Sequence, residues 1–267
     1  MILDQLADYS AQRVNEALKL KSFQEIKKEA ENLPKGNFSF EKAMRREGLS
    51  IIAEVKKASP SKGVIDKNFD YMAIARDYEA AGVDAMSCLT EPKWFLGSNQ
   101  IFEEIRAAVD LPMLRKDFTV DPYQMYESKV MGADAVLIIV SLLNGDKELL
   151  KEYLSISDQL GISSLVETHD SREIELAIAC GARIIGVNNR NLKDFTVNFE
   201  NAKNLRQQVP ADVLFVAESG VTSTEDVAAI VEMGADAALI GEALMRSKDK
   251  KQTLAEFRQA GERLNEN

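Results

Sequence analysis

The chain has 267 residues, of which 45% are hydrophobic and 28% charged, a composition typical of an ordinary folded protein and unlike that of a disordered chain. Its 43 Asp and Glu residues outnumber 33 Lys and Arg residues, which gives a net charge of −10. This balance excludes an electrostatic basis for binding duplex nucleic acid, so an anionic ligand must be held by local cations and amide groups.

The cysteines and the N-terminus indicate a cytoplasmic protein. Cys88 and Cys180 stand among apolar neighbours and outside metal-type spacings, which predicts buried thiols in a reducing compartment. Residues 1–10 lack the basic and apolar regions of a signal peptide. The longest obvious apolar run, at 135–140, is far shorter than the ~18 residues that a membrane span needs. We therefore expect a cytoplasmic protein with no membrane partner.

The first 48 residues carry helical patterns. Apolar side chains recur there at helical spacing: Leu3, Leu6, Val14, Ala17 and Leu18, then Phe23, Ile26 and Ala30. A short third helix would be capped by Ser39. We expect residues 1–48 to form an extension packed on a single domain of residues 49–267, because the extension is too small to fold alone.

Four similar segments recur at intervals of roughly fifty residues, a spacing that indicates a repeat. They lie at 81–89, 131–139, 180–188 and 233–241, and carry Gly82, Gly132, Gly181 and Gly234. Each glycine follows a helical pattern and precedes an apolar run, as a glycine just beyond a helix end does. Further apolar runs lie between these segments, at 51–56, 112–118, 163–168 and 213–220.

Interleaved, the two sets of runs predict eight strands with a helix in each gap. Helix starts are visible at Ser223, followed by Glu225 and Asp226, and at Asp121-Pro122. Strict alternation predicts a parallel sheet, and eight such units predict a closed (β/α)8 TIM barrel with an N-terminal helical extension. An open doubly wound sheet is the alternative. The even period favours closure, and no GxGxxG motif follows the first strand.

Charged side chains gather where these strands end. Glu54 and Lys56 face the same side of the first strand, because side chains alternate with period two. Strand ends further along the chain carry Glu91, Arg115, Lys116, Asp117, Glu167, Asn188, Arg190 and Glu218. Each alone could be a solvated terminus or a structural ion pair. Because barrel enzymes place their chemistry at this mouth, the set together predicts a site rich in acids and bases.

Glycines follow the last two strands, in AESG at 217–220 and LIGEAL at 239–244. Barrels often bind phosphate at this position through backbone N–H groups, although ordinary tight turns are the alternative. At ~1.5 Å per residue the first helix is as long as a barrel is high. We expect this helix to lie by the mouth and enclose the ligand, with Phe38 and Phe40 at the opposite end.

Several of these motifs together resemble one enzyme family. EVKKASPSKG, LTEPKWFLGS (89–98), LRKDF, LVET, GVNNRNL (186–192), AESG and IGEALM are similar to the motifs of indole-3-glycerol phosphate synthases of tryptophan biosynthesis. The resemblance runs from about residue 38 to residue 246, and it is to the stand-alone enzyme, without a fused isomerase. It implies ring closure of 1-(2-carboxyphenylamino)-1-deoxyribulose 5-phosphate with loss of carbon dioxide and water, a lyase reaction that requires no cofactor and no metal.

The resemblance also implies roles for individual residues. Lys116 matches the family's general acid and Glu167 its general base. Lys56 matches a substrate-contacting lysine that is a second candidate acid, and Glu54 a positioning carboxylate. Further matches are Asn188, Glu218 and Ser219 in the catalytic set; Phe95, Phe118 and Leu137 at the aromatic ring; Arg190 at an anionic group; and Ser59, Gly220, Gly241 and the amide of Glu242 around the phosphate.

Three local features qualify these assignments. Glu242 stands where some relatives have a small hydroxyl residue, so its carboxylate is expected to point away from the phosphate. Ala58 replaces a lysine found in some members. His169 follows Glu167, but Asp170-Ser171 indicates a helix start, so we expect His169 to be a loop residue. We further expect Lys56 and Lys116 to lower each other's pKa, with Glu54 limiting the effect.

Two other functions are compatible with such a barrel. One is an isomerase or epimerase of a sugar phosphate, which would leave the Glu54–Lys56–SPS constellation unexplained. The other is a non-catalytic anion-binding barrel, in which the lysines are only counter-charges. For the synthase, and equally for a sugar-phosphate isomerase, we expect a phosphorylated small molecule as partner and no nucleic acid. We also expect a monomer, with a weak dimer as the alternative.

Overall fold

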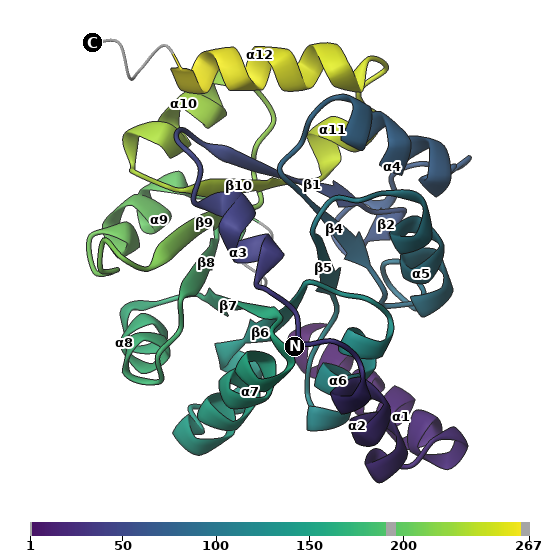
Figure 1. Cartoon of the computed structure of the whole chain (residues 1–267). Coiled ribbons are helices and arrows are strands. Elements are labelled where there is room, and N and C mark those ends of the chain that lie inside the picture. The colour runs from purple at the N-terminus through teal and green to yellow at the C-terminus, as the bar shows by residue number, and fades with distance from the viewer. Residues whose placement is uncertain (1, 191–195, 263–267) are drawn as a thin grey trace.

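Eight parallel strands close into a barrel that is surrounded by helices (Figure 1). The computed structural model describes residues 2–190 and 196–262. Around the barrel the strands follow the order β1-β10-β9-β8-β7-β6-β5-β4, so barrel strands that are consecutive in the chain lie side by side, and the last strand pairs with the first. The barrel strands are β1 (Ser50–Val55), β4 (Ala85–Leu89), β5 (Met113–Lys116), β6 (Ala135–Ile139), β7 (Ser163–Thr168), β8 (Ile184–Asn188), β9 (Leu214–Glu218) and β10 (Ala237–Ile240). The predicted (β/α)8 barrel is confirmed.

Helices alternate with these strands. They are α4 (Tyr71–Ala80), α5 (Asn99–Ala108), α6 (Pro122–Val130), α7 (Lys147–Leu160), α8 (Ser171–Ala179), α9 (Phe199–Arg206), α10 (Thr224–Glu232), α11 (Glu242–Arg246) and α12 (Lys250–Glu262), with the 3₁₀ helix η1 (Val140–Leu143). Ser223 caps α10 in a reciprocal capping box. Asp121 caps α6, and Pro122 is the first residue of that helix, as predicted. The four repeat glycines have φ values of 76°, 82°, 88° and 79°, the left-handed conformation expected just past a helix end.

The barrel strands bury both of their faces, which is why they read as almost continuous apolar runs. Ile52, Leu114 and Leu165 belong to a cluster inside the barrel. Ile51 and Met113 belong to a second cluster, between the strands and the outer helices. A residue's place in this alternation therefore decides whether its side chain enters the barrel.

The extension consists of α1 (Ile2–Leu20), α2 (Phe23–Asn32) and α3 (Ser39–Met44). α2 packs on α6, and α3 lies across the middle of the strand ring (Figure 1). Phe40 and Met44 of α3 are fully buried in the cluster inside the barrel, so α3 plugs the end opposite the strand carboxyl termini.

The predicted cap of α3 is wrong. Ser39 is the first helical residue, and its hydroxyl bonds the carboxylate of Asp134 instead of a helix amide. The cap position is taken by Phe38, at φ 58°, which makes no side-chain cap bond. The chain turns sharply here to direct Phe40 into the barrel, and this geometry overrides the local preference for a serine cap.

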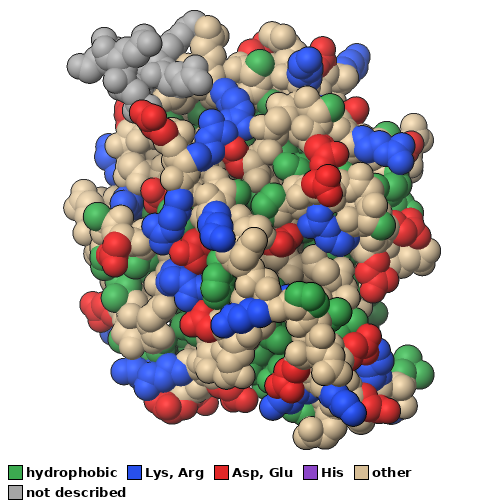
Figure 2. Space-filling model, viewed as in Figure 1, with side chains coloured by type: hydrophobic (Ala, Val, Ile, Leu, Met, Phe, Trp, Pro, Cys, Tyr) green, Lys and Arg blue, Asp and Glu red, His purple; other side chains and the backbone are tan. Residues whose placement is uncertain are grey.

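The surface charges, the helices and the two cysteines add three observations. On the face that Figure 2 shows, which α3 covers, basic and acidic side chains are interspersed, so the negative net charge is not gathered into one patch there. Within the described residues, no helix has the length and apolarity required to cross a membrane. Cys88 is buried as expected, but Cys180 is partly exposed, because it caps the surface end of α8.

We expect Phe40→Ala to lower the free energy of unfolding by about 3–5 kcal/mol, because it empties a filled site inside the barrel. The folded fraction should keep its kcat, since α3 lies at the end away from the cavity. Chemical denaturation with parallel activity assays measures both quantities. Leu33→Ala, at a side chain 40% exposed, is the control and should change the unfolding free energy by less than ~0.5 kcal/mol. A Phe40→Ala protein of native stability would contradict the role of α3 as a plug.

Candidate active site

The carboxyl ends of the strands direct a set of ionisable groups into the barrel. Glu54, Lys116 and Glu167 each come two residues after an inward-facing apolar residue, and Glu218 likewise follows Val216. Glu167 and Glu218 are 2% and 1% exposed. The alternation that fills the barrel with apolar side chains therefore ends, on four strands, in a buried layer of charge.

These side chains line a cavity whose empty space is about 1190 Å3 when the open solvent at its mouth is included. Every residue to which the family resemblance assigns a role lies on its wall, whereas Glu91 and Arg115 of the strand-end set do not line it. The residues with an assigned role are Glu54, Lys56, Ser59, Phe95, Lys116, Phe118, Leu137, Glu167, Asn188, Arg190, Glu218, Ser219, Gly220, Gly241 and Glu242. The structure thus brings together residues spread over nearly 190 positions of the chain.

Lys116 lies at the centre of the charged layer. Its Nζ donates to Glu218 Oε2 at 2.9 Å and lies 3.3 Å from Glu167 Oε2. Burial alone would lower the pKa of Lys116, but the carboxylates of Glu218, Glu167 and Glu54 outweigh burial and raise it. The expectation that Lys56 lowers the pKa of Lys116 is therefore wrong. Lys56 is instead paired with Glu54, which neutralises its influence.

The two carboxylates beside Lys116 differ in their proton affinity. Burial raises the pKa of Glu218, and the neighbouring charge of Glu167 raises it further, against the attraction of Lys116. For Glu167, burial acts the same way, but Lys116 and His169 outweigh it and lower the pKa. One buried carboxyl group thus favours its acid form and the other its base form, an arrangement suited to proton transfer.

His169 joins this network, although its place just after Glu167 was interpreted only as that of a loop residue. It lies in the loop between β7 and α8, as predicted, with Asp170 as the helix cap. Its Nε2 is 3.3 Å from Glu167 Oε1, and its Nδ1 is 3.3 Å from Glu173 Oε2. Burial alone would lower the pKa of His169, but these two carboxylates raise it to about 10. His169 is therefore a cation at neutral pH and supports the ionised form of Glu167.

Two glycines make space for the charged side chains. A Cβ on Gly241 would overlap the carboxylate of Glu54, and it would lie 2.9 Å from Nζ of Lys56. A Cβ on Gly186 would overlap the carboxylate of Glu218. Gly241 was expected to serve phosphate only, and Gly186 was not expected in the site at all. With these carboxylates in place, both positions require glycine, because a long side chain from the neighbouring strand occupies the space that a Cβ would fill.

The turns after β9, β10 and β1 form one side of the cavity. Ser219 and Gly220 both have positive φ, 67° and 91°, so the chain reverses sharply after Glu218. The segment after β1 folds into a hairpin of β2 (Ala58–Ser59) and β3 (Gly63–Val64), which the sequence did not reveal. Glu242 bonds Arg246 Nε at 3.0 Å, so its carboxylate turns along α11, as expected.

The other side of the cavity is apolar. Phe95 and Phe118 pack with their ring centroids 6.0 Å apart, and Leu137 continues this wall from β6. Ile2 and Leu6 of α1 also line the cavity, which confirms that the first helix lies by the mouth.

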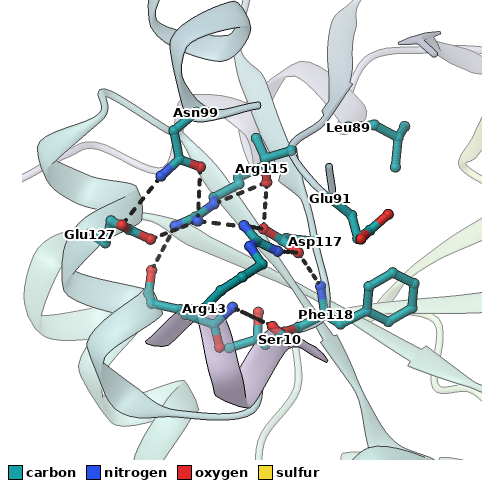
Figure 3. A network of polar contacts seen from close by, with 12 residues as sticks. Ser10, Arg13, Leu89, Glu91, Asn99, Arg115, Asp117, Phe118 and Glu127 are labelled. Atoms are coloured by element: carbon teal, nitrogen blue, oxygen red, sulfur yellow. Dashed lines mark hydrogen bonds and ion pairs between the residues drawn. The ribbon is translucent and has the colours of Figure 1, made fainter. Parts of the chain in front are cut away.

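A buried ion network fixes α1 in this place (Figure 3). Both guanidinium nitrogens of Arg13 bond Asp117, at 2.9 and 2.8 Å, and Arg115 contacts Asp117 from the other side at 3.5 Å. Burial would raise the pKa of Asp117, but the two guanidinium groups outweigh burial and lower it. The Ser10 hydroxyl donates to the carbonyl of Phe118 at 2.6 Å. Asp117, adjacent to Lys116, is therefore a structural ion-pair residue, one of the alternatives considered for strand-end charges.

Asn188 and Arg190 complete the rim. Asn188 Nδ2 donates to Glu167 Oε1 at 3.4 Å, and Asn188 Oδ1 accepts the backbone N–H of Arg190 at 3.0 Å. The GVNNRNL motif continues to residues 191 and 192, which lie outside the described residues. Asn188 thereby links the predicted base to the residue expected to face an anion.

Fold and site define this chain as a TIM-barrel enzyme with a charged acid–base layer at the carboxyl ends of its strands. The family model described as indole-3-glycerol phosphate synthase matches residues 3–257. Proteins of that name from Ruminiclostridium cellulolyticum and Leuconostoc mesenteroides are 52% and 47% identical, each alignment covering 97% of this chain and 99% of the relative. The chain belongs to the indole-3-glycerol phosphate synthase family.

Solved structures support the same fold at low sequence identity. The 3-hexulose-6-phosphate synthase from Salmonella typhimurium has a TM-score of 0.65 at 14% identity, covering 80% of this chain and 99% of that one. At such identity the similarity concerns the barrel alone.

We expect the unfolding free energies of the wild type and His169→Asn to converge as pH rises from about 6.5 to 10. A folded pKa of about 10, above the unfolded value of ~6.5, stabilises the protein fully below pH 6.5 and loses that effect as pH rises through 10. The asparagine of the variant does not titrate, so the variant lacks this pH-dependent contribution to the free energy of unfolding. Denaturant titrations from pH 5.5 to 10 test this, and a difference that is constant with pH would contradict the ion pair with Glu167.

Proposed function

We propose that this chain converts 1-(2-carboxyphenylamino)-1-deoxyribulose 5-phosphate into indole-3-glycerol phosphate, carbon dioxide and water. Family membership supports the reaction, and the distribution of side chains around the cavity supports the orientation of the substrate. The observation that carries the proposal is the position of Lys116 between Glu167 and Glu218, at 3.3 and 2.9 Å, inside a cavity with one apolar and one glycine-rich side.

The strand order divides the cavity into arcs. The neighbouring strands β4, β5 and β6 lead to Phe95 and Phe118 and carry Leu137, which suit the anthranilate ring. The neighbouring strands β9, β10 and β1 lead to Gly220, Gly241 and Ser59, which suit the phosphate. The side chains of the acid–base layer extend from strands of both arcs and from β7 to meet in the middle of the cavity, where the ketone carbon of an extended substrate would lie. An isomerase of a simple sugar phosphate would have no use for the apolar arc.

Lys116 would act as the general acid of ring closure. The ring carbon that bears the carboxylate attacks the ketone carbon, and the carbonyl oxygen gains a proton as it becomes a hydroxyl group. Because the pKa of Lys116 is raised, its ammonium is fully protonated before the reaction. Because its ion pairs stabilise the ammonium form, Lys116 would donate its proton only as negative charge develops on the carbonyl oxygen. Loss of carbon dioxide then restores the aromatic ring.

Glu167 would act as the base in dehydration. Its lowered pKa keeps it ionised, and its contacts with His169 and Asn188 fix its orientation. Glu218, whose pKa is raised, would carry a proton in the same layer and limit the repulsion between the carboxylates. Ser219 follows Glu218 and would contribute through the turn that presents Gly220.

Lys56, Arg190 and Glu54 would handle the charge of the substrate. The substrate carries a carboxylate and a phosphate, whereas four glutamates line the cavity. Lys56 and Arg190 are the cations that face these groups, with the Arg190 guanidinium able to form two bonds to one oxyanion. Glu54 holds Lys56 by an ion pair, so it would position this lysine rather than transfer a proton. Glu242 would contribute its amide.

The organisation and setting of the enzyme are also proposals. Residues 1–48 would act as an extension that both plugs the barrel and covers the substrate, on a catalytic domain formed by residues 49–267. We infer a cytoplasmic monomer, with a weak dimer as the alternative. We expect no nucleic-acid partner, because the net charge of −10 disfavours binding to polyanions.

We expect Lys116→Met to lower kcat by at least ~100-fold, the usual size of a general-acid contribution, with a smaller change in KM. Formation of the fluorescent indole product from the carboxyphenylamino substrate measures both. Lys203→Met, on the exposed face of α9, is the matched control and should behave as the wild type. Native turnover by folded Lys116→Met would remove Lys116 from the mechanism. Isomerised sugar phosphate in place of indole, or binding without turnover, would instead favour the two alternative functions.

Removing the phosphate from the substrate or from an unreactive analogue should weaken binding by several kcal/mol. The backbone donors near Gly220 and Gly241 would lose their charged acceptor and remain partly shielded from water. Calorimetric titration with the phosphorylated and dephosphorylated forms of one analogue provides the comparison. Equal affinities would argue against a phosphate site at the ends of β9 and β10.

A further inference from the structure

Glu91 is a fully buried carboxylate that no part of the proposed mechanism uses. It lies two residues beyond β4, and its exposed fraction is 0%. Among the described residues, no Lys, Arg or His nitrogen lies within ion-pair distance of it. A buried charge of this kind is costly unless hydrogen bonds satisfy it.

Three successive backbone amides satisfy Glu91. Its Oε1 accepts the N–H of Lys93 at 2.8 Å, and its Oε2 accepts those of Trp94 and Phe95 at 2.7 and 2.9 Å. The Glu91 carbonyl also accepts the N–H of Gly97 at 2.9 Å. The side chain thus replaces the hydrogen bonds that a helix or sheet would provide, and the loop of residues 91–97 folds around it.

The residues held by Glu91 point in two useful directions. Phe95 enters the cavity and packs on Phe118. Trp94 packs edge-on against Tyr9 of α1, with ring centroids 5.7 Å apart, and Lys93 Nζ lies 4.4 Å from the Trp94 centroid. One carboxylate therefore sets both the apolar wall of the cavity and a contact with the helix that borders it.

We infer that Glu91 is a positioning residue that determines how well the cavity accepts the aromatic end of the substrate. It acts through Phe95 and Trp94 and touches no reacting atom. This inference rests on the proposed function, in which Phe95 faces the anthranilate ring. The Glu91 carboxylate does not pair with a charge on the substrate, because backbone amides already bond both of its oxygens.

Glu91→Gln provides the test, because it keeps the shape and replaces one oxygen by an NH2 group that opposes an amide donor. We expect KM to rise about tenfold, the size that loss of one buried hydrogen bond implies, with a smaller fall in kcat. The emission of Trp94, the one tryptophan of the chain, should shift because the loop changes its contact with Tyr9. Glu103→Gln, the same change at an exposed position on α5, should leave KM and emission unaltered.

A double-mutant cycle with Phe95→Ala separates positioning from general destabilisation. If Glu91 acts through Phe95, Glu91→Gln adds little to the KM of Phe95→Ala. Additive effects, or native KM and emission in Glu91→Gln, would overturn the inference. Should Glu91→Gln not fold, Glu91→Asp keeps the charge and should raise KM in the same direction, and native KM there would also overturn it. An unchanged KM in Phe95→Ala alone would instead count against the proposed orientation of the substrate.

Discussion

The ammonium group of Lys116 is the interaction on which the site depends. Glu167 and Glu218 are almost completely buried, and each contacts Lys116, at 3.3 and 2.9 Å. Without a cation beside them, both buried carboxyl groups would favour their protonated forms. The same group that would donate a proton therefore also permits the acid–base layer to exist in a folded barrel. Function and stability meet in one side chain, as is common in strained or charged active sites.

The extension divides its work between the two ends of the barrel. α3 closes one end with apolar side chains, and its contribution is to stability. α1 borders the cavity at the other end, and the Arg13–Asp117 pair joins it to the strand end that carries Lys116 and Phe118. Displacement of α1 would therefore disturb the apolar wall as well as uncover it. The Glu91 loop meets α1 from a second strand end, through Trp94 and Tyr9.

The charged layer also explains why the barrel contains glycines where other strands have side chains. Gly186 and Gly241 lie inside the barrel beside Glu218 and Glu54, and either position with a Cβ would displace a carboxylate. Glu54 and Glu218 are thus accommodated by the missing side chains of Gly241 and Gly186. Close packing leaves no room for both a Cβ and the carboxylate at these two positions.

The sequence by itself determined the barrel and the charged strand ends that enter the site, but it did not indicate the parts played by Gly186 and His169. Period-two alternation, helix-end glycines such as Gly82 and the spacing of the repeat are local properties, and they predict eight strands whose charged ends must meet in a closed ring. Only the tertiary structure decided which charges pair and which way their pKa values move. Lys116 and Glu218 are 102 positions apart and Arg13 and Asp117 are 104 apart, so no local pattern relates them. The pKa of Lys116 rises, against expectation, because the distances to three carboxylates and the degree of burial set the electrostatic energy, and both quantities exist only in the folded chain.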